Sequence, residues 1–164
     1  MSKINVTVSC PIDTYSGYGA RSRDLVKALL KTGKYDVKVL AQRWGNTRFG
    51  YLQDHVESEL RSIVGPQITA QPDVWIQITV PNEFQKVGKY NIGVTAGIET
   101  TICDPSWIEG LNRMDLNLVS SNHAKQTFET SKFNVEKDGQ LQGQIELSKP
   151  VEVLFEGADL EKYF

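Results

Sequence analysis

Apolar and polar residues alternate at the start of the chain. Positions 4, 6, 8 and 10 are apolar, and positions 5, 7 and 9 are polar. A period of two residues predicts a β-strand. A loop follows Pro11, and residues 20–30 then carry apolar side chains at positions 25, 26, 29 and 30, the spacing of one helical face. Gly33 suits the end of that helix and residues 36–41 predict a second strand, so the first unit is strand, helix, strand.

The same kinds of pattern continue along the chain. Residues 51–64 predict a helix that Gly65-Pro66 ends. Further helices are expected to begin at Asp104-Pro105 and after residues 120–122, where N-cap residues stand. Strands are expected over residues 74–80, 90–95, 115–119 and 151–155. The apolar face of the helix over residues 51–64 consists of Leu52, Val56, Leu60, Ile63 and Val64. The helix that begins at Asp104-Pro105 has Trp107, Ile108 and Leu111 on this face, and the helix after residues 120–122 has Ala124, Phe128 and, as a further candidate, Ser131.

Residues 134–149 differ from the rest of the chain. The segment is polar, contains two glycines and has no periodic apolar face, which predicts a flexible exposed insertion or a hairpin. Strands separated by helices elsewhere imply a mostly parallel sheet with helices on both faces. We therefore expect residues 1–164 to form a single α/β, Rossmann-like domain.

Composition excludes several other classes. The chain has 164 residues, 40% of them apolar, and a formal net charge of −2, which fits one globular domain and offers no basic field for nucleic acid. Residues 62–72, the longest uncharged stretch, are too few and too polar for a transmembrane segment. The alternating start is unlike a secretory signal, so we expect a cytoplasmic protein whose Cys10 and Cys103 are reduced and buried. His55, on a predicted helix, is expected to be a solvated surface residue.

The loop that opens the first helix is a candidate binding site. Tyr15, Ser16, Gly17, Tyr18 and Gly19 follow the first strand, where glycines let a ligand approach the backbone and free N–H groups can hold an anion. The pattern is G-x-G-x-x-S, so the third glycine of a dinucleotide fingerprint is missing, and the second strand ends without an acidic residue. A nicotinamide or flavin site, a simple turn and a ligand-facing loop all remain open. Arg21 and Arg23, in the first helical turns, fit either an anionic ligand or solvation.

Two further loops carry candidate chemistry. Glu99 and the adjacent Thr100 follow a predicted strand, and a carboxylate there can orient sugar hydroxyls or act as a base. Ser121, Asn122 and His123 stand at another junction of strand and helix, where hydroxyls and a neutral imidazole could hold a polyol. Glu99 also fits a solvated carboxylate, and Ser120, Ser121 and Asn122 also fit helix capping. We interpret Glu99 and His123 as candidate catalytic residues.

The order of these motifs resembles the N-terminal, acceptor-side domain of GT-B glycosyltransferases of the retaining type. The likeness rests on the glycine loop at residues 16–19, the helix that contains Trp107, the segment 115–123 and the closing run 151–164. That run is similar to the family's strand, Asn-Gly-Val-Asp turn and terminal Phe, although Glu156 and Ala158 replace the Asn and the Val. The resemblance as a whole covers almost the entire chain.

The resemblance implies a function that the chain shares with a second domain. In the family a C-terminal domain binds the nucleotide-sugar, and such a domain is absent from these 164 residues. The resemblance implies a nucleotide-sugar donor, an unknown acceptor, no metal or other cofactor, and binding by Tyr15, Ser16, Gly17, Tyr18, Gly19, Thr100, Ser121 and Asn122. We expect the isolated chain to be inactive, to need the missing domain or a partner chain, and to form some homodimer through an orphaned interface.

Three alternatives stay open beside the glycosyltransferase. One is half of a nucleotide-sugar epimerase, which would convert the donor without an acceptor. Another is a Rossmann-like oxidoreductase or methyltransferase, which would bind its cofactor without a partner. The last is a non-enzymatic binding or assembly module, which would have a stable partner and no affinity for sugars or nucleotides.

Overall fold

A computed structural model describes residues 3–65, 67–137 and 140–157 of the chain. The helical elements are α1 (Gly17–Lys31), α2 (Tyr51–Asp54), α3 (Ser58–Ser62), η1 (Pro81–Glu83), α4 (Pro105–Asn112) and α5 (Asn122–Thr130). The strands are β1 (Ile4–Cys10), β2 (Tyr35–Ala41), β3 (Val64–Gly65), β4 (Val74–Ile78), β5 (Tyr90–Thr95), β6 (Leu116–Val119), β7 (Phe133–Lys137), β8 (Gln140–Ile145) and β9 (Val151–Val153).

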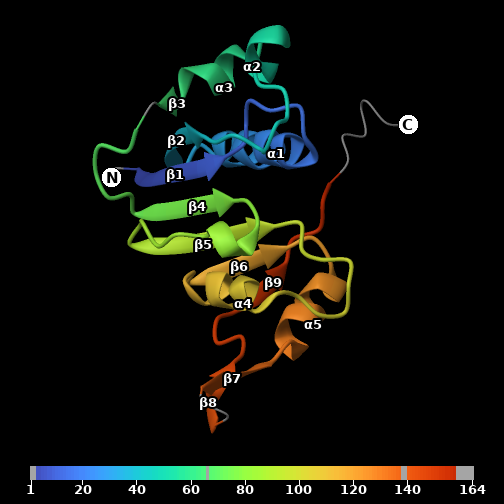
Figure 1. Cartoon of the computed structure of the whole chain (residues 1–164). Helices are drawn as coiled ribbons and strands as arrows, with labels where there is room; N and C mark the ends of the chain where they lie inside the picture. The colour runs from blue at the N-terminus through green and yellow to red at the C-terminus, as the bar shows by residue number, and fades with distance from the viewer. Residues whose placement is uncertain (1–2, 66, 138–139, 158–164) are drawn as a thin grey trace.

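Seven strands form one parallel sheet in the order β3-β2-β1-β4-β5-β6-β9. The chain builds outward from β1 to β3, crosses back to β4, and then builds outward in the other direction to β9. Helices flank the sheet on both faces, which confirms the predicted Rossmann-like α/β class. All seven carboxyl ends point to one edge of the sheet (Figure 1).

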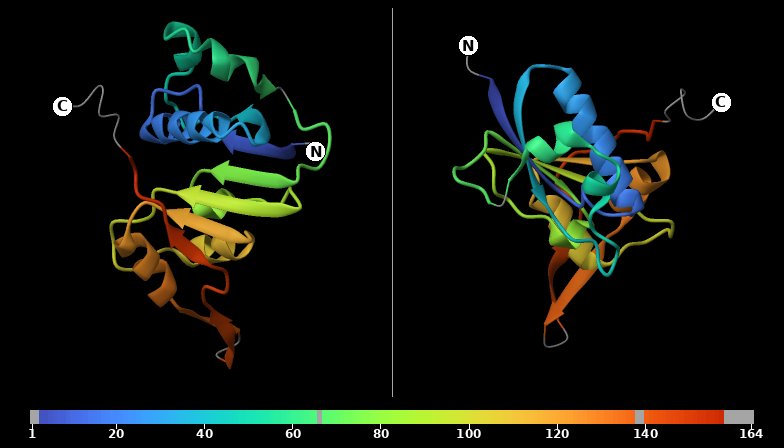
Figure 2. Two further views of the ribbon diagram at one scale, coloured as in Figure 1. Left: turned by 180° about the vertical axis from the view of Figure 1, so that it is seen from behind. Right: turned by 90° about the horizontal axis from the view of Figure 1, so that it is seen from above.

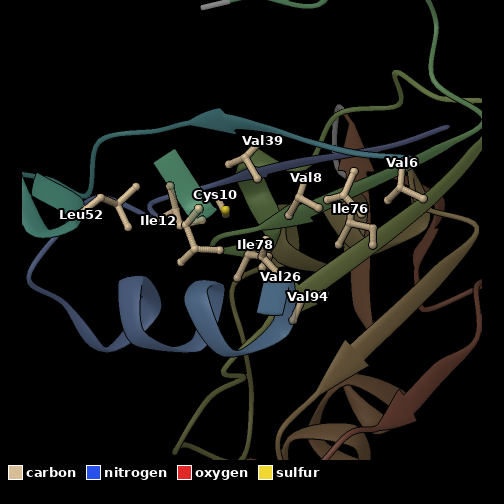
Figure 3. Close-up of a cluster of buried hydrophobic side chains, with 12 residues drawn as sticks. Val6, Val8, Cys10, Ile12, Val26, Val39, Leu52, Ile76, Ile78 and Val94 are labelled. Carbon is tan, nitrogen blue, oxygen red and sulfur yellow. The ribbon is translucent and has the colours of Figure 1, made fainter. Parts of the chain in front are cut away.

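One hydrophobic core lies between the sheet and α1. Val6, Val8 and Cys10 of β1 pack there with Val26 of α1, and all four side chains are buried. Figure 3 shows this cluster, which β2, β4 and β5 complete. The predicted alternation of β1 is therefore confirmed, and its apolar face is the one that α1 covers.

A second core lies on the opposite face of the sheet. Ile108 and Leu111 of α4 and Phe128 of α5 are fully buried there, together with Phe84 beside η1 and Trp75 of β4. The helices predicted after Asp104 and after residues 120–122 both form, and Ser131 is buried at the end of α5. Both cysteines are free and buried, as expected.

The single helix expected over residues 51–64 is wrong. The chain forms α2 and α3 with a break at Val56, which has a left-handed φ of 53° and is 78% exposed. An ion pair of 2.8 Å between Lys27 of α1 and Glu57 holds the segment after the break. Val64 belongs to β3 and pairs with Val39 of β2, so the end of the expected helix is a strand. The apolar period alone could not separate two short helices from one.

The polar insertion is the antiparallel hairpin β7–β8, which begins at Phe133, one residue before the predicted segment. It projects beyond the end of the sheet in both views of Figure 2. β4 and β9 each end two residues earlier than predicted, at Ile78 and Val153. The predicted turn at residues 158–159 and the terminal Phe164 lie outside the described residues.

Candidate functional site

The strand order reverses between β1 and β4, at the carboxyl edge of the sheet. In open α/β sheets this switch point is where ligands bind, because the adjacent loops run to opposite faces and leave a crevice. Two pockets lie there. The larger, of about 500 Å³, is on the face away from α1, and the smaller, of about 240 Å³, lies against the start of α1.

The loop between β1 and α1 is held by hydrogen bonds within the protein. Ser16 caps α1, since its Oγ accepts from the Gly19 N–H at 2.9 Å. This cap starts the helix at Gly17, three residues before the predicted start. Arg23 donates from Nη1 to the carbonyls of Ile12 at 2.7 Å and Thr14 at 3.0 Å. The loop is therefore a rigid wall of the crevice.

Arg23 corrects one sequence expectation. Its side chain is not solvated, since the residue is 6% exposed, and it lines neither of the two switch-point pockets. Its guanidinium lies 3.4 Å from the centre of the Tyr51 ring. Burial lowers the pKa of Arg23 from its ordinary value. Arg23 is thus a structural residue that joins the loop to α2.

Tyr18 connects three elements at the switch point. Its hydroxyl is 3.0 Å from Thr95 Oγ1 at the end of β5 and accepts from the Ala96 N–H at 3.1 Å. Its ring stacks on Trp44 of the loop after β2, with the ring centres 4.1 Å apart. Tyr18 lines the smaller pocket and Trp44 lines the larger one. The stacked pair therefore stands between the two pockets, and Ile78 lines both.

The larger pocket combines aromatic and polar side chains. Trp44 is half-buried, and Trp75 is 3% exposed and forms part of the wall. Gln77 is fixed, because its Oε1 accepts from the Gln85 N–H at 2.8 Å and its Nε2 donates to the Glu83 carbonyl at 3.0 Å. The full lining is Ser9, Pro11, Leu40, Gln42, Arg43, Trp44, Ile68, Trp75, Gln77, Ile78, Thr79, Glu83, Gln85 and Val87. An aromatic surface beside amides and one carboxylate can hold a ligand with both an apolar face and hydroxyl groups.

The smaller pocket lies at the first turn of α1. Gly17, Tyr18 and Arg21 line it with Thr95 and with Glu156, which follows β9. Arg21 donates from Nη2 to the Leu154 carbonyl at 2.9 Å, and its Nε is 4.0 Å from Glu156 Oε1. The guanidinium is therefore already partnered by this chain, although it still borders the pocket.

The two glycines of the loop differ in what surrounds them. A Cβ on Gly19 would lie 2.4 Å from the Thr14 carbonyl oxygen, so the packing of the loop against the helix requires glycine there. A Cβ on Gly17 would meet nothing within 4 Å, and Gly17 is not among the glycines with positive φ. Nothing in the described fold requires glycine at position 17.

Tyr15 lines neither pocket. Its hydroxyl donates to Asp54 Oδ2 at 2.6 Å, and its ring lies edge-on to Tyr51 with the ring centres 5.1 Å apart. The hydrogen bond to Asp54 raises the pKa of Tyr15. The exposed ring of His55 stacks on the other side of this cluster, on Tyr51, so His55 is a surface residue as predicted.

Glu99 and His123 lie at the carboxyl edge but line neither switch-point pocket. Glu99 is exposed on the loop after β5. His123 is exposed at the start of α5, and its Nε2 is 3.2 Å from the carbonyl oxygen of Thr100. It borders a separate hollow of about 190 Å³. The loop and α5 thus bring Thr100 and His123 together, apart from the glycine loop.

Ser121 and Asn122 occupy the start of α5. Ser121 is the N-cap, and its Oγ accepts from the Ala124 N–H at 3.1 Å. Asn122 is exposed. Gly97 has a φ of 94° and its Cβ would lie 2.4 Å from that of Ala124, so α5 packs tightly against the loop that carries Glu99. Capping therefore accounts for Ser121.

Sequence reasoning missed the residues of the larger pocket. Neither Trp44, in the loop after the second strand, nor the strand residues Trp75 and Gln77 are among the residues that the sequence patterns single out. One signal was present: positions 77 and 79 are polar between apolar neighbours, as are positions 5, 7 and 9. Polar residues on inner parallel strands are unusual, because such strands are normally apolar on both faces.

The described residues form neither a cluster that could hold a metal ion nor a helix that could span a membrane. No group of three or more His, Cys, Asp or Glu side chains among them is placed to hold a metal ion. None of the described helices is long and apolar enough to cross a membrane.

The class that the fold and the crevice define is a Rossmann-like α/β domain with its pockets at the switch point. Comparison of the chain with protein-family models, curated proteins and solved structures found no match in any of the three.

Proposed function

We propose that the chain is the acceptor-side domain of a glycosyltransferase, which holds the acceptor while a sugar is transferred from a nucleotide-sugar. The observation that carries this proposal is the larger pocket at the switch point, where half-buried Trp44 borders Gln42, Gln85 and Glu83. A sugar ring has an apolar C–H face that packs on an aromatic ring, and its hydroxyls both donate to and accept from amides and carboxylates.

The smaller pocket supports the same proposal from the other side of the Tyr18–Trp44 pair. Gly17 borders it without a structural reason to be glycine, which fits a ligand that approaches the backbone closely. A donor-binding domain or a partner chain would close over this edge and supply the groups that stabilise the leaving nucleotide. Glu99 and His123 stay predicted catalytic residues, and the closing domain would have to bring the acceptor to them.

A titration followed by ¹H–¹⁵N NMR tests the proposal on the 164-residue chain. The three tryptophans give separate indole signals: Trp44 and Trp75 line the pocket, and Trp107 on α4 lines neither pocket and serves as the internal control. We expect saccharides to shift the indole signals of Trp44 and Trp75 and to leave that of Trp107 unchanged. NAD and S-adenosylmethionine serve as probes of the competing cofactor-dependent classes.

The outcomes separate the hypotheses. Tight binding of NAD or S-adenosylmethionine, without a response to saccharides, would replace the proposal with an oxidoreductase or methyltransferase. A lack of response to saccharides and to UDP-glucose or GDP-mannose would leave a non-enzymatic module as the better description.

A further inference from the structure

We propose that the face of the sheet opposite α1, over β2, β1 and β4, is a trough that binds an extended, neutral oligosaccharide. A third pocket, of about 280 Å³, lies on this face. It shares Leu40 and Ile68 with the larger switch-point pocket, so the two hollows adjoin. The choice of a saccharide rests on the proposed function, and the trough itself rests on the geometry.

The two pockets follow one strand. Asn5 and Thr7 of β1 line the third pocket, and Ser9 and Pro11 line the larger one. Residues at alternate positions of a strand lie on one face. With a rise of about 3.3 Å per residue, the distance from Asn5 to Pro11 is roughly 20 Å. The trough is therefore long enough for a chain of several sugar rings.

In the described part of the chain, the main helix contacts of β1 and β2 are with α1, on the other face, while α5 contacts β6 and β9. This face of β1 is nevertheless polar, with Asn5, Thr7 and Ser9 where an inner parallel strand is normally apolar. Asn5 Oδ1 is buried and has no hydrogen-bond partner among the described residues. A buried acceptor without a donor is unfavourable, so contacts among the described residues do not explain a polar side chain at Asn5, which lines the third pocket.

The charges favour a neutral ligand over the other extended polymers. Lys38 is the charged residue of the third pocket, and Arg43 and Glu83 are the charged residues of the larger one. A nucleic acid would require several cations along its path, because its backbone carries one phosphate per residue. Hydroxyl and amide groups instead line both pockets, and two tryptophans line the larger one, which is the chemistry that recognises a chain of polyol rings.

The test compares short and long probes on the full chain. Maltotetraose, cellotetraose and chitotetraose, each with its monosaccharide, are titrated at millimolar concentration and followed by NMR. We expect one tetrasaccharide to shift the backbone signals of Thr7 and Lys38 as well as the Trp44 indole, whereas its monosaccharide shifts the indole alone. The double variant Lys38→Ala/Gln67→Ala changes two exposed residues of the third pocket and should weaken tetrasaccharide binding about three- to ten-fold.

Lys34→Ala is the matched control, since Lys34 is exposed on the turn before β2 and lines none of these pockets. It should leave the tetrasaccharide affinity unchanged. A response of Trp44 to every probe length, with no response at Thr7 or Lys38, would overturn the trough and leave the proposed function standing. No response to any probe, or a response at Thr7 to an unstructured peptide only, would overturn the trough as well. UDP-glucose and GDP-mannose binding then decides the proposed function separately.

Discussion

The two faces of β1 differ in what surrounds them. Val6, Val8 and Cys10 pack under α1 in a closed apolar core, and Thr7 and Ser9, one residue away in each case, border pockets. One face of β1 thus contributes to the hydrophobic core, and the other face carries polar groups that border pockets. The contrast teaches that the conformational stability and the candidate binding properties of this domain can be changed separately, by substitutions at neighbouring positions.

The largest expected effect comes from introducing asparagine on each face of β1. Val8→Asn places an amide in a site with 0% exposure and no partner, so we expect the free energy of unfolding to fall by about 4 kcal/mol. Thr7 is only 7% exposed but lines the third pocket, which has room for the longer side chain of Thr7→Asn, so the expected loss is about 1 kcal/mol or less. Urea unfolding followed by circular dichroism measures both. Equal losses would show that the face of β1 that borders the pockets is as closely packed as the face under α1.

The two glycines of the first loop repeat the contrast between closed and open surroundings. Gly19→Ala forces a Cβ against the Thr14 carbonyl, and we expect a loss of about 2 kcal/mol in the free energy of unfolding. Gly17→Ala meets no neighbour and should change that free energy by less than about 0.5 kcal/mol. The same unfolding experiment compares the two variants. A large loss for Gly17→Ala would remove the support that this glycine gives to a ligand at the smaller pocket.

Substitution of Trp44 tests the larger pocket at the switch point. Trp44→Ala removes the stack on Tyr18 and the aromatic wall of the larger pocket, so we expect saccharide affinity to fall about tenfold. Trp44→Phe keeps an aromatic ring and should retain most of the affinity. Isothermal titration calorimetry with the saccharide that gives the largest NMR response measures the change. Unchanged affinity in Trp44→Ala would move the binding site away from this pocket.

Individual elements show which parts of the fold can be predicted from the sequence and which cannot. The alternation in β1 and the N-cap at Asp104 each determine a local structure through side chains that are close in sequence, and both elements form as predicted. At the break, Val56 has a left-handed φ and the next residue, Glu57, pairs with Lys27, which is distant in sequence, so the spacing of apolar residues does not reveal the break.

The candidate site was predicted less completely than the fold. The glycine loop follows the first predicted strand, and the loops after parallel strands lie at the carboxyl edge of a sheet. The stack of Tyr18 on Trp44 joins residues 26 positions apart, and the wall at Trp75 comes from a third segment, so the polar positions of a single strand do not predict the assembled pocket. Whether Glu99 and His123 act on a substrate stays a prediction, since the fold sets both apart from these pockets.

The smallest expected effect tests whether the apolar face of β1 under α1 is closed to water at the carboxyl end of the strand. Cys10 is the last residue of β1 and has 0% exposure, and burial raises the pKa of its thiol to about 12 from an ordinary value of 9.0. Above about pH 9 the thiol therefore ionises in the unfolded chain first, so the folded state loses stability as the pH rises through this window. Between about pH 8 and pH 10 the contribution of Cys10 to that loss should be about 1 kcal/mol. Cys10→Ala should make the alkaline decline in the free energy of unfolding shallower by this amount, whatever the variant's stability at neutral pH. Identical slopes for the two proteins would mean that the Cys10 thiol already ionises in the folded state, and hence that the end of the covered face is open to water.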